Sequence, residues 1–445
     1  MRAALERINP FKTPEVRRLA ILFAIVYFAQ GMWYLPKQAI TIVLKDRGLD
    51  AGQVADFFLI ATIPWLIKPV YGLISDFVPL FGYRRRSYFM LTSGVAALAG
   101  LVLATSGLIK HGAITTSTLA LPFSGTMTYT FVAGVGLFTV MALGLAFTDV
   151  LTDATMVESG RPRGLTGAFQ SVQWAAITLS GLAVGVGGGY LAGARNLTLA
   201  FLVAAAFPLV TLVMTWKYVP EARAAATAGA FRQTWQAIRR ALGERDVWAV
   251  AGFLFFYTFS PSFGPAFTYY QTDVLRFGQE FIGFLDSVTS VGQVAGALLY
   301  APLSRRVRLK WLMIATIGLS VAGTLAYLLY RDQVSALIIS AAFGVTGMIT
   351  VLSFLDLAAK ACPKHVEATF FALLMSVYNA GVQVSENVGA RLYTSFAADV
   401  GARGAYSRLI FVSAGLTALA WLLIPLVKID RIEAKALKDA TAPAS

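Results

Sequence analysis

The sequence predicts an all-α membrane protein with twelve transmembrane helices arranged in two halves of six. Three observations support this fold class. The chain of 445 residues is 57% hydrophobic and only 13% charged, with a mean hydropathy of +0.67, whereas about a quarter of the residues in a soluble domain are charged. Twelve apolar runs have the roughly 20 residues that a helix needs to cross the hydrocarbon core. One long polar connection divides these runs into two sets of six.

The apolar runs follow one another with short connections. The first run follows a basic N-terminal segment and is too long for the apolar part of a signal peptide, so we interpret it as a membrane span. An even number of spans places both termini on the same side of the membrane. We predict spans at 19–44, 53–75, 87–109, 128–157, 165–190, 197–217, 247–271, 279–303, 310–330, 334–359, 367–392 and 407–428.

The distribution of positive charge predicts the orientation. Of the 37 Lys and Arg residues, 26 lie in the termini and in the connections on their side, and nine lie in the opposite connections. Because cytoplasmic loops are enriched in Lys and Arg, both termini are predicted to be cytoplasmic. The other two, Lys37 and Lys68, lie inside spans. Short termini without a transit peptide favour a bacterial inner membrane over a plastid envelope.

The longest connection predicts the domain organisation. Its apolar residues recur at helical spacing between Phe231 and Leu242, beside arginines, which predicts an amphipathic helix on the cytoplasmic membrane face. Tyr27 and Tyr257 match in a weak internal repeat between spans 1 and 7, for which chance similarity is the alternative explanation. We expect an N-terminal bundle at 1–217, a cytoplasmic linker at 218–246, a C-terminal bundle at 247–428 and a cytoplasmic tail at 429–445.

Lys68 lies inside the second predicted span, between Pro64 and Pro69. An ionisable residue at membrane depth is costly, which makes it a functional-site hypothesis and requires a partner. Asp149 lies at a similar depth in the fourth span, with Asp153 on the same helix face. Two interpretations follow. Lys68 binds an anionic substrate while Asp149 exchanges a proton, or the two form a structural ion pair between helices.

Other polar residues inside the spans extend the candidate site. Lys37 lies near the outer end of the first span, where its side chain can either snorkel to the surface or contact substrate. Asp153 and Asp356 lie near cytoplasmic helix ends and are expected as gate residues, and Asp286 is expected as an interior acid. Polar stripes at helical spacing are formed by Ser376, Asn379, Gln383 and Glu386 in span 11, and by Gln170, Gln173 and Trp174 in span 5.

The spans also contain glycines at regular spacing and many aromatic residues. Glycines at every fourth position from Gly181 to Gly189 continue the stripe of span 5, and we expect them to permit close helix packing. The aromatic residues either stack on a flat heterocyclic substrate or anchor the helices at the membrane interface. The aromatic candidates are Trp33, Tyr34, Trp65, Trp174, Tyr257, Tyr269 and Tyr270.

Several function classes find no support in the sequence. The basic residues are spread over short loops without interleaved aromatic residues, which argues against nucleic-acid binding. One cysteine (Cys362) and two histidines (His111 and His365) argue against a disulfide framework, a metal site and a haem-binding bundle. Neither a Walker-type phosphate loop nor a nucleophile elbow occurs, so we expect no cofactor and no enzymatic activity.

The stretch PWLIKPVYGLISDFVPLFGYRRRSY at 64–88 resembles the signature of the folate–biopterin transporter family of the major facilitator superfamily. Four further segments support the resemblance: QGMWYLP at 30–36, TDVLTDATMVE at 148–158, FSPSFGPAF at 259–267 and CPKHVEATFFALLMSVYN at 362–379. The interval from Asp76 to Gly82 is longer than in the general facilitator motif, a departure shared with this family. The corresponding second-half loop at 303–306 lacks the acid, which predicts an asymmetric gate.

The resemblance implies a major facilitator fold that moves folates or pterins by alternating access, coupled to protons. We expect a monomer in the lipid bilayer. The alternatives are a carrier of another metabolite, such as S-adenosylmethionine or a muropeptide, and a nontransporting membrane sensor. The expected substrate-binding residues are Lys68, Asp149, Lys37, Trp65, Gln170, Gln173, Trp174, Tyr378, Asn379 and Gln383. The expected proton-coupling or gate residues are Asp76, Arg84, Arg85, Arg86, Asp153, Asp286, Asp356 and Glu386.

Overall fold

The computed structural model describes residues 11, 13–121, 125–160, 163, 165–218, 235–236, 238–239, 242–362 and 367–441. The described chain is helical except for one hairpin and the connections. Its elements are α2 (Pro14–Met32), α3 (Lys37–Asp46), α4 (Ala51–Leu66), α5 (Lys68–Phe77), α6 (Arg86–Ser106), α7 (Leu108–His111), β1 (Ile114–Leu121), β2 (Gly125–Val132), α8 (Val135–Gly160), α9 (Thr166–Gly193), α10 (Leu197–Tyr218), α12 (Arg245–Thr258), α13 (Pro265–Tyr269), the π-helix η2 (Tyr270–Val274), α14 (Gln279–Arg306), α15 (Leu309–Ala326), the 3-10 helix η3 (Tyr327–Leu329), α16 (Gln333–Ala361), α17 (Glu367–Leu419), the 3-10 helix η4 (Ala420–Leu423), α18 (Ile424–Val427) and α19 (Ile429–Thr441).

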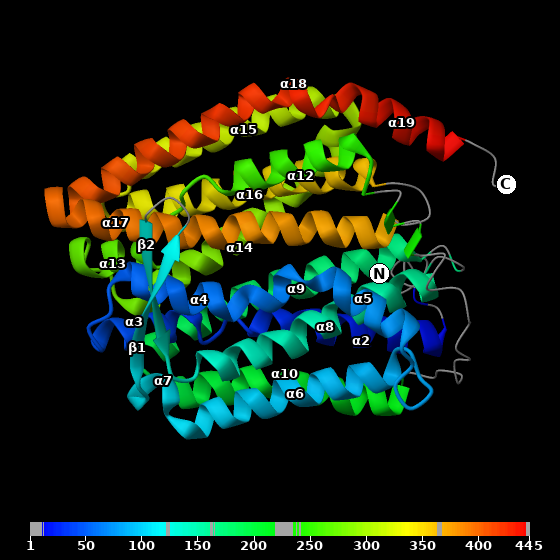
Figure 1. The fold of residues 1–445 in the computed structure, drawn as a ribbon, viewed down its shortest axis with the longest axis horizontal. Helices are drawn as coiled ribbons and strands as arrows, with labels where there is room; N and C mark the ends of the chain where they lie inside the picture. The colour runs from blue at the N-terminus through cyan, green and yellow to red at the C-terminus, as the bar shows by residue number, and fades with distance from the viewer. Residues whose placement is uncertain are drawn as a thin grey trace, which may run out of the picture.

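The long helices lie roughly along one axis, so the molecule has two distinct ends (Figure 1). One end carries the β1–β2 hairpin together with α3, α7 and α13, and we call it the hairpin end. The opposite end carries the connection from α5 to α6 and the C-terminal helix α19, and we call it the loop end. In the same view, α2 to α10 fill the lower part and α12 to α19 fill the upper part.

Ten helices in the described chain are long and apolar enough to cross a membrane, which confirms the all-α membrane fold. The number ten differs from the predicted twelve for two reasons. One of the ten is a 59-residue stretch, Thr369–Val427, that joins the predicted spans 11 and 12. It bends at Gly401, whose φ of 72° lies in the left-handed region. The predicted span at 247–271 is broken into α12 and α13, and neither piece has the length of a span.

Three of the predicted spans are interrupted where proline or glycine occurs. The first span is divided at Trp33–Pro36, because Pro36 has no N–H to continue the ladder of the preceding helix. The seventh span is divided at 259–264, between α12 and α13, and Gly264 there has a φ of 47°. The second span is divided at Ile67, where Pro69 occupies the first turn of α5. Backbone groups released at such breaks need other partners inside a membrane.

The predicted start of the fourth span at 128 is wrong, because a hairpin precedes the helix. Residues 128–132 belong instead to β2, which pairs antiparallel with β1 from Ile114↔Val132 to Leu121↔Gly125, and α8 begins only at Val135. Both strands are rich in threonine, and β-branched residues favour an extended chain over a helix. The hairpin is anchored by Arg47, whose guanidinium donates to the carbonyl oxygens of Ile109 (2.8 Å) and Gly112 (2.5 Å).

Aromatic side chains fill the core of the first half. Phe57, Phe138 and Phe201 are fully buried there, and the ring of Phe138 stacks on Trp33 with 4.8 Å between ring centroids. In contrast, α9 packs on α14 through small residues. A Cβ atom placed on Gly185 would lie 2.6 Å from the carbonyl oxygen of Gly283. The expected role of the span 5 glycines in close helix packing is therefore confirmed.

The predicted amphipathic helix of the linker lies mostly outside the described residues. The domain limits at 217, 246 and 428 remain predictions.

Candidate functional site

The break between α4 and α5 positions Lys68. Pro69 follows it directly and cannot donate a backbone hydrogen bond, so α4 ends at Leu66 and α5 begins at Lys68. The phenolic O–H of Tyr71 donates to the carbonyl oxygen of Pro64 over 2.9 Å, which satisfies a group near the break. The lysine therefore extends from the first residue of a new helix segment, at the level of the interruption.

Lys68 and Asp149 form a short, buried ion pair. Nζ of Lys68 lies 2.6 Å from Oδ2 of Asp149, and the side chains are 16% and 5% exposed. The ammonium group also lies 4.8 Å from the centroid of the Trp65 ring, within the range of a cation–π contact. Of the two acids of the fourth predicted span, Asp149 and Asp153, it is therefore Asp149 that contacts Lys68.

Asp153 lies on the same face of α8 as Asp149 but has a different partner. The hydroxyl of Tyr27, a fully buried residue of α2, donates a hydrogen bond to Oδ1 of Asp153. The Asp153 side chain is nevertheless exposed. Two polar pairs therefore lie one helical turn apart along α8 within the first half, Lys68–Asp149 and Tyr27–Asp153.

A second polar group lies between the two halves. Nζ of Lys37 lies 3.5 Å from Oε2 of Glu386 on α17, and the side chains are 37% and 22% exposed. The same ammonium group lies 5.4 Å from the centroid of the Phe58 ring. Asp286 of α14 is exposed and close enough to Lys37 for a favourable charge interaction. This pair is longer and more open to solvent than Lys68–Asp149.

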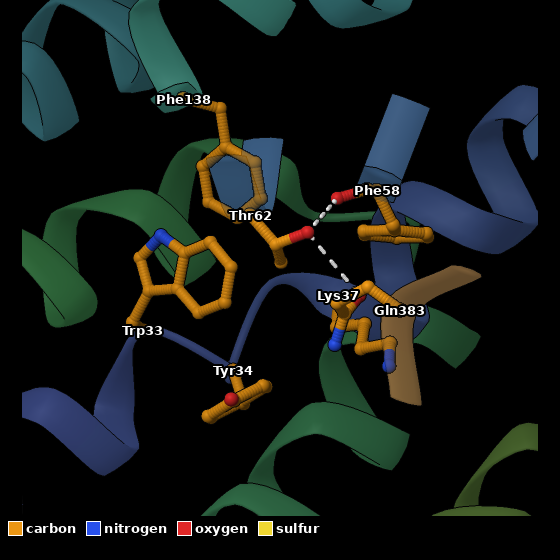
Figure 2. Close-up of a pocket in the computed structure, with 7 residues that line it drawn as sticks. All are labelled: Trp33, Tyr34, Lys37, Phe58, Thr62, Phe138 and Gln383. Carbon is orange, nitrogen blue, oxygen red and sulfur yellow. Dashed lines mark hydrogen bonds between the residues drawn. The ribbon is translucent and has the colours of Figure 1, made fainter. Parts of the chain in front are cut away.

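A small pocket adjoins Lys37 and is mostly aromatic (Figure 2). Thr62 donates to Gln383 Oε1 over 3.2 Å, and this hydrogen bond joins α4 to α17. The pocket volume of about 10 Å³ holds roughly one water molecule, so a bicyclic ligand requires the halves to move apart. The lining residues are Trp33, Tyr34, Lys37, Phe58, Thr62, Phe138 and Gln383.

The connection between α5 and α6 forms an ionic cluster at the loop end. Arg85 Nη2 lies 2.6 Å from Asp76 Oδ1 and 2.7 Å from Glu158 Oε1, while its Nη1 donates to Ser75 Oγ over 2.7 Å. Burial disfavours the guanidinium charge, but the hydrogen bonds to Glu158 and Asp76 outweigh burial and raise the pKa of Arg85. The cluster ties the end of α5 to α8.

The neighbouring arginines of this connection lie beside the cluster. Arg86 donates to the carbonyl oxygen of Trp216, at the end of α10, over 2.9 Å. Arg84 is half-buried in the same connection. Of the predicted gate residues, Asp76, Arg84, Arg85 and Arg86 therefore lie together at the loop end of the first half.

The remaining predicted site residues lie outside these groups. Gln170, Gln173 and Trp174 lie near the start of α9, and the side chains of Gln170 and Trp174 are exposed. Tyr378 and Asn379 are half-buried on α17, and Tyr378 packs on the core of the second half. Within the described residues, no hydrogen bond joins these five to either lysine.

Asp356 lies at the loop end within the second half. It accepts from Lys360 over 2.8 Å, and Lys360 also donates to Glu433 of α19 over 3.3 Å. The acid thus belongs to contacts that hold the C-terminal helix against α16.

A third charged group, centred on Asp56 of α4, was not among the predicted site residues. Its carboxylate is buried and pairs with Arg391 of α17, with 2.5 Å between Oδ1 and Nη2. The signal was available, because Asp56 interrupts an apolar run in the same way as Lys68 does. Within the described residues, no cluster of three or more His, Cys, Asp or Glu side chains could hold a metal ion.

The architecture matches solved transport proteins over nearly the whole chain. A bacterial homologue of the human lysosomal transporter Spinster superimposes with a TM-score of 0.67, covering 97% of this chain and 100% of that one at 12% identity. The nucleoside transporter NupG gives a TM-score of 0.66 over 94% of this chain and 100% of that one, at 13% identity. Identities this low establish the fold alone, which is that of the major facilitator transporters.

The sequence places the chain within one family of that fold. The model of the BT1 family matches residues 30–444. A protein named folate-biopterin transporter from Synechocystis sp. is 33% identical over 409 residues, covering 87% of this chain and 76% of the relative. The chain belongs to the BT1 family, and it is a multi-pass membrane protein. The resemblance drawn from residues 64–88 is thereby confirmed.

Proposed function

We propose that this protein transports folate or a related pterin across the membrane by alternating access. One observation carries the proposal: Lys37, a cation held only loosely by Glu386, borders an aromatic pocket between the two halves. A folate joins a flat heterocyclic ring to carboxylates, and these groups suit aromatic and cationic partners respectively. The relative from Synechocystis sp. is named as a folate-biopterin transporter, and one from Plasmodium falciparum as folate transporter 2, which supports this substrate class.

The two lysines are assigned different roles because their ion pairs differ. Glu386 lies 3.5 Å from Lys37 on the opposite half, so a substrate carboxylate can replace it when the halves separate. Asp149 lies 2.6 Å from Lys68 within the same half and is 5% exposed, which makes direct replacement harder. We therefore assign substrate binding to Lys37 and assign coupling to the Lys68–Asp149 pair.

Proton coupling follows from the second assignment. A proton that binds Asp149 neutralises the carboxylate and releases the Lys68 ammonium group from its partner. The freed cation then attracts an anionic substrate, so proton and substrate bind together without a net unpaired charge in the site. Asp153, exposed and next to Asp149 on α8, is positioned to pass the proton from the loop end.

The remaining parts of the proposal concern the membrane. We propose a monomer in a bacterial inner membrane, with the loop end and both termini cytoplasmic, as the Lys and Arg distribution favours. The Asp76–Arg85–Glu158 cluster would then close the cytoplasmic side. We propose no enzymatic activity and no cofactor.

Uptake of radiolabelled folate into proteoliposomes, with and without an inward proton gradient, tests the function. Saturable uptake that the gradient stimulates supports proton-coupled transport. Equal uptake with a collapsed gradient contradicts the coupling. Saturable folate binding without flux identifies a sensor instead. Uptake of radiolabelled S-adenosylmethionine in the same vesicles, without uptake of folate, identifies a carrier of cations that would use the exposed acids Asp153 and Asp286.

A further inference from the structure

Asp56 of α4 is a buried carboxylate whose three donors come from two other elements, α17 and β2. Its side chain is 2% exposed. Oδ1 accepts from Arg391 Nη2 over 2.5 Å and from Asn387 Nδ2 over 2.8 Å, and Oδ2 accepts from the backbone N–H of Thr130 over 3.0 Å. A buried carboxylate with three donors is fully satisfied, so separation of these elements would leave it without partners.

Arg391 is held as firmly as Asp56. Its Nε donates to Asn387 Oδ1 over 3.0 Å, and Nη2 also donates to the carbonyl oxygen of Thr128 over 2.7 Å. The guanidinium carbon lies 5.4 Å from the centroid of the Tyr129 ring. Thr128 and Thr130 of strand β2 therefore contact the ion pair through their backbone, and Tyr129 between them contacts it through its ring.

The group joins the two halves at the hairpin end. Asp56 belongs to α4, Asn387 and Arg391 belong to α17, and the strand partners belong to the hairpin inserted between α7 and α8 (Figure 1). Among the described residues, two other ion pairs join the halves, Lys37–Glu386 and Lys45–Asp273, and both are more exposed. We call Asp56, Asn387, Arg391 and β2 the hairpin clamp.

We propose that the hairpin clamp is the gate of the hairpin end, and that the hairpin is a working part of this gate; the proposal rests on transport by alternating access. Opening at this end requires α4 and α17 to separate. Separation breaks the Asp56–Arg391 pair and removes Arg391 from the Thr128 carbonyl. Water must then reach both charges, so the clamp favours the closed arrangement until substrate or a proton offsets its loss.

Site-directed labelling tests the clamp without substrate. The Cys362→Ser protein has no cysteine, and Thr62→Cys adds one reporter on the pocket wall. In vesicles whose hairpin end faces outward, a membrane-impermeant maleimide should label this reporter slowly. Asp56→Asn should raise the labelling rate by roughly tenfold or more, because a minor open state of 0.1–10% can become the main state. Arg391→Lys, which keeps the charge but loses the planar fork, should give an intermediate rate.

A matched substitution controls for the loss of any aspartate at this end. Asp46→Asn breaks an exposed pair with Arg195 that lies within the first half, so the labelling rate should not change. The double variant Asp56→Asn/Arg391→Gln removes both charges and leaves no unpaired buried ion, which keeps the test valid if a single variant fails to reach the membrane. Equal labelling of Asp56→Asn, the double variant and Asp46→Asn would overturn the proposal.

A reversible crosslink gives an independent test. A Cβ atom on Gly52 would lie 3.4 Å from the Cα atom of Arg391, which is close enough for a disulfide between the two positions. The Gly52→Cys/Arg391→Cys protein carries the same Thr62→Cys reporter, which is reversibly blocked while the crosslink is oxidised. The maleimide should label the reporter quickly when the crosslink is reduced and slowly when the crosslink is formed. Equal rates would contradict the gate. Because labelling needs no folate, absence of folate uptake would defeat the proposed substrate and leave the clamp standing.

Discussion

Nζ of Lys68 lies 2.6 Å from Oδ2 of Asp149, and the pair joins a break in one membrane helix, at Lys68, to the continuous helix α8. A tight pair at a helix interruption differs from an ordinary structural salt bridge, because the backbone around it is already released from the helix. We therefore expect protonation of the pair to allow a local movement of α5 against α8.

The Lys68–Asp149 pair should show strong coupling in a double-mutant cycle. Lys68→Ala leaves a buried carboxylate without its partner, which should lower the free energy of unfolding by about 3–5 kcal/mol. The double variant Lys68→Ala/Asp149→Ala removes both charges and should lose less stability than Lys68→Ala alone. Chemical denaturation in mixed micelles measures both values. Additive losses in the cycle would show that the two side chains do not interact.

Lys37 and Glu386 should affect folate binding in opposite directions. Lys37→Gln should weaken binding by roughly tenfold or more, because a hydrogen bond to a charged group contributes about 1.5–3 kcal/mol. Glu386→Gln frees Lys37 from its competitor and should tighten binding. Titration calorimetry on the purified protein measures both. Lys310→Gln is the control, because it breaks an exposed pair with Asp430 at the loop end. Weaker folate binding by Glu386→Gln would contradict the idea that Glu386 competes with folate for Lys37.

Gly185 should not tolerate a side chain. Its Cβ would lie 2.6 Å from the backbone of Gly283, so Gly185→Ala must push α9 and α14 apart and should cost about 1–3 kcal/mol of stability. Gly347→Ala is the matched control, because nothing lies within 4 Å of its Cβ position. The two melting temperatures in detergent provide the comparison. A loss in Gly347→Ala as large as in Gly185→Ala would show that alanine harms any helix in this protein.

Arg85 should be required for transport rather than for folate binding. Arg85→Ala breaks contacts to Asp76, Glu158 and Ser75, and initial uptake should fall by roughly tenfold, equal to about 1.4 kcal/mol. Arg85→Lys keeps the charge but not the forked geometry and should retain part of the rate. Uptake assays and binding assays on the same preparation separate the two effects.

Arg163→Ala provides the control for the loss of an arginine near the loop end. It breaks an exposed pair with Glu15 and an exposed hydrogen bond to the carbonyl oxygen of Ser159, and it should leave uptake unchanged. A large loss of folate affinity in Arg85→Ala would place this residue in the binding site instead.

Much of the fold could be predicted from the sequence, because apolar length and charge placement decide which segments enter a membrane. The same logic found Lys68 and its partner Asp149, since a buried charge at membrane depth requires a counter-charge. It failed at 128–132, where an apolar count cannot distinguish a strand rich in β-branched residues from the start of a helix. Asp56 was overlooked because it lies only three residues from the predicted start of its span at 53, where a charge near the membrane surface demands a partner less strongly than one at the depth of Lys68.

The interruptions at 33–36 and 259–264 occupy corresponding positions in spans 1 and 7. A proline lies at the end of each: Pro36 precedes α3, and Pro265 is the first residue of α13. Both interruptions lie next to α17: Trp33 and Tyr34 share a pocket with Gln383, and a Cβ on Gly264 would lie 2.9 Å from the carbonyl oxygen of Glu386. We expect a ligand bound at these breaks to contact the main chain as well as side chains, and no side-chain substitution removes the main-chain part. Alanine scanning of this protein should therefore underestimate how strongly it recognises its cargo.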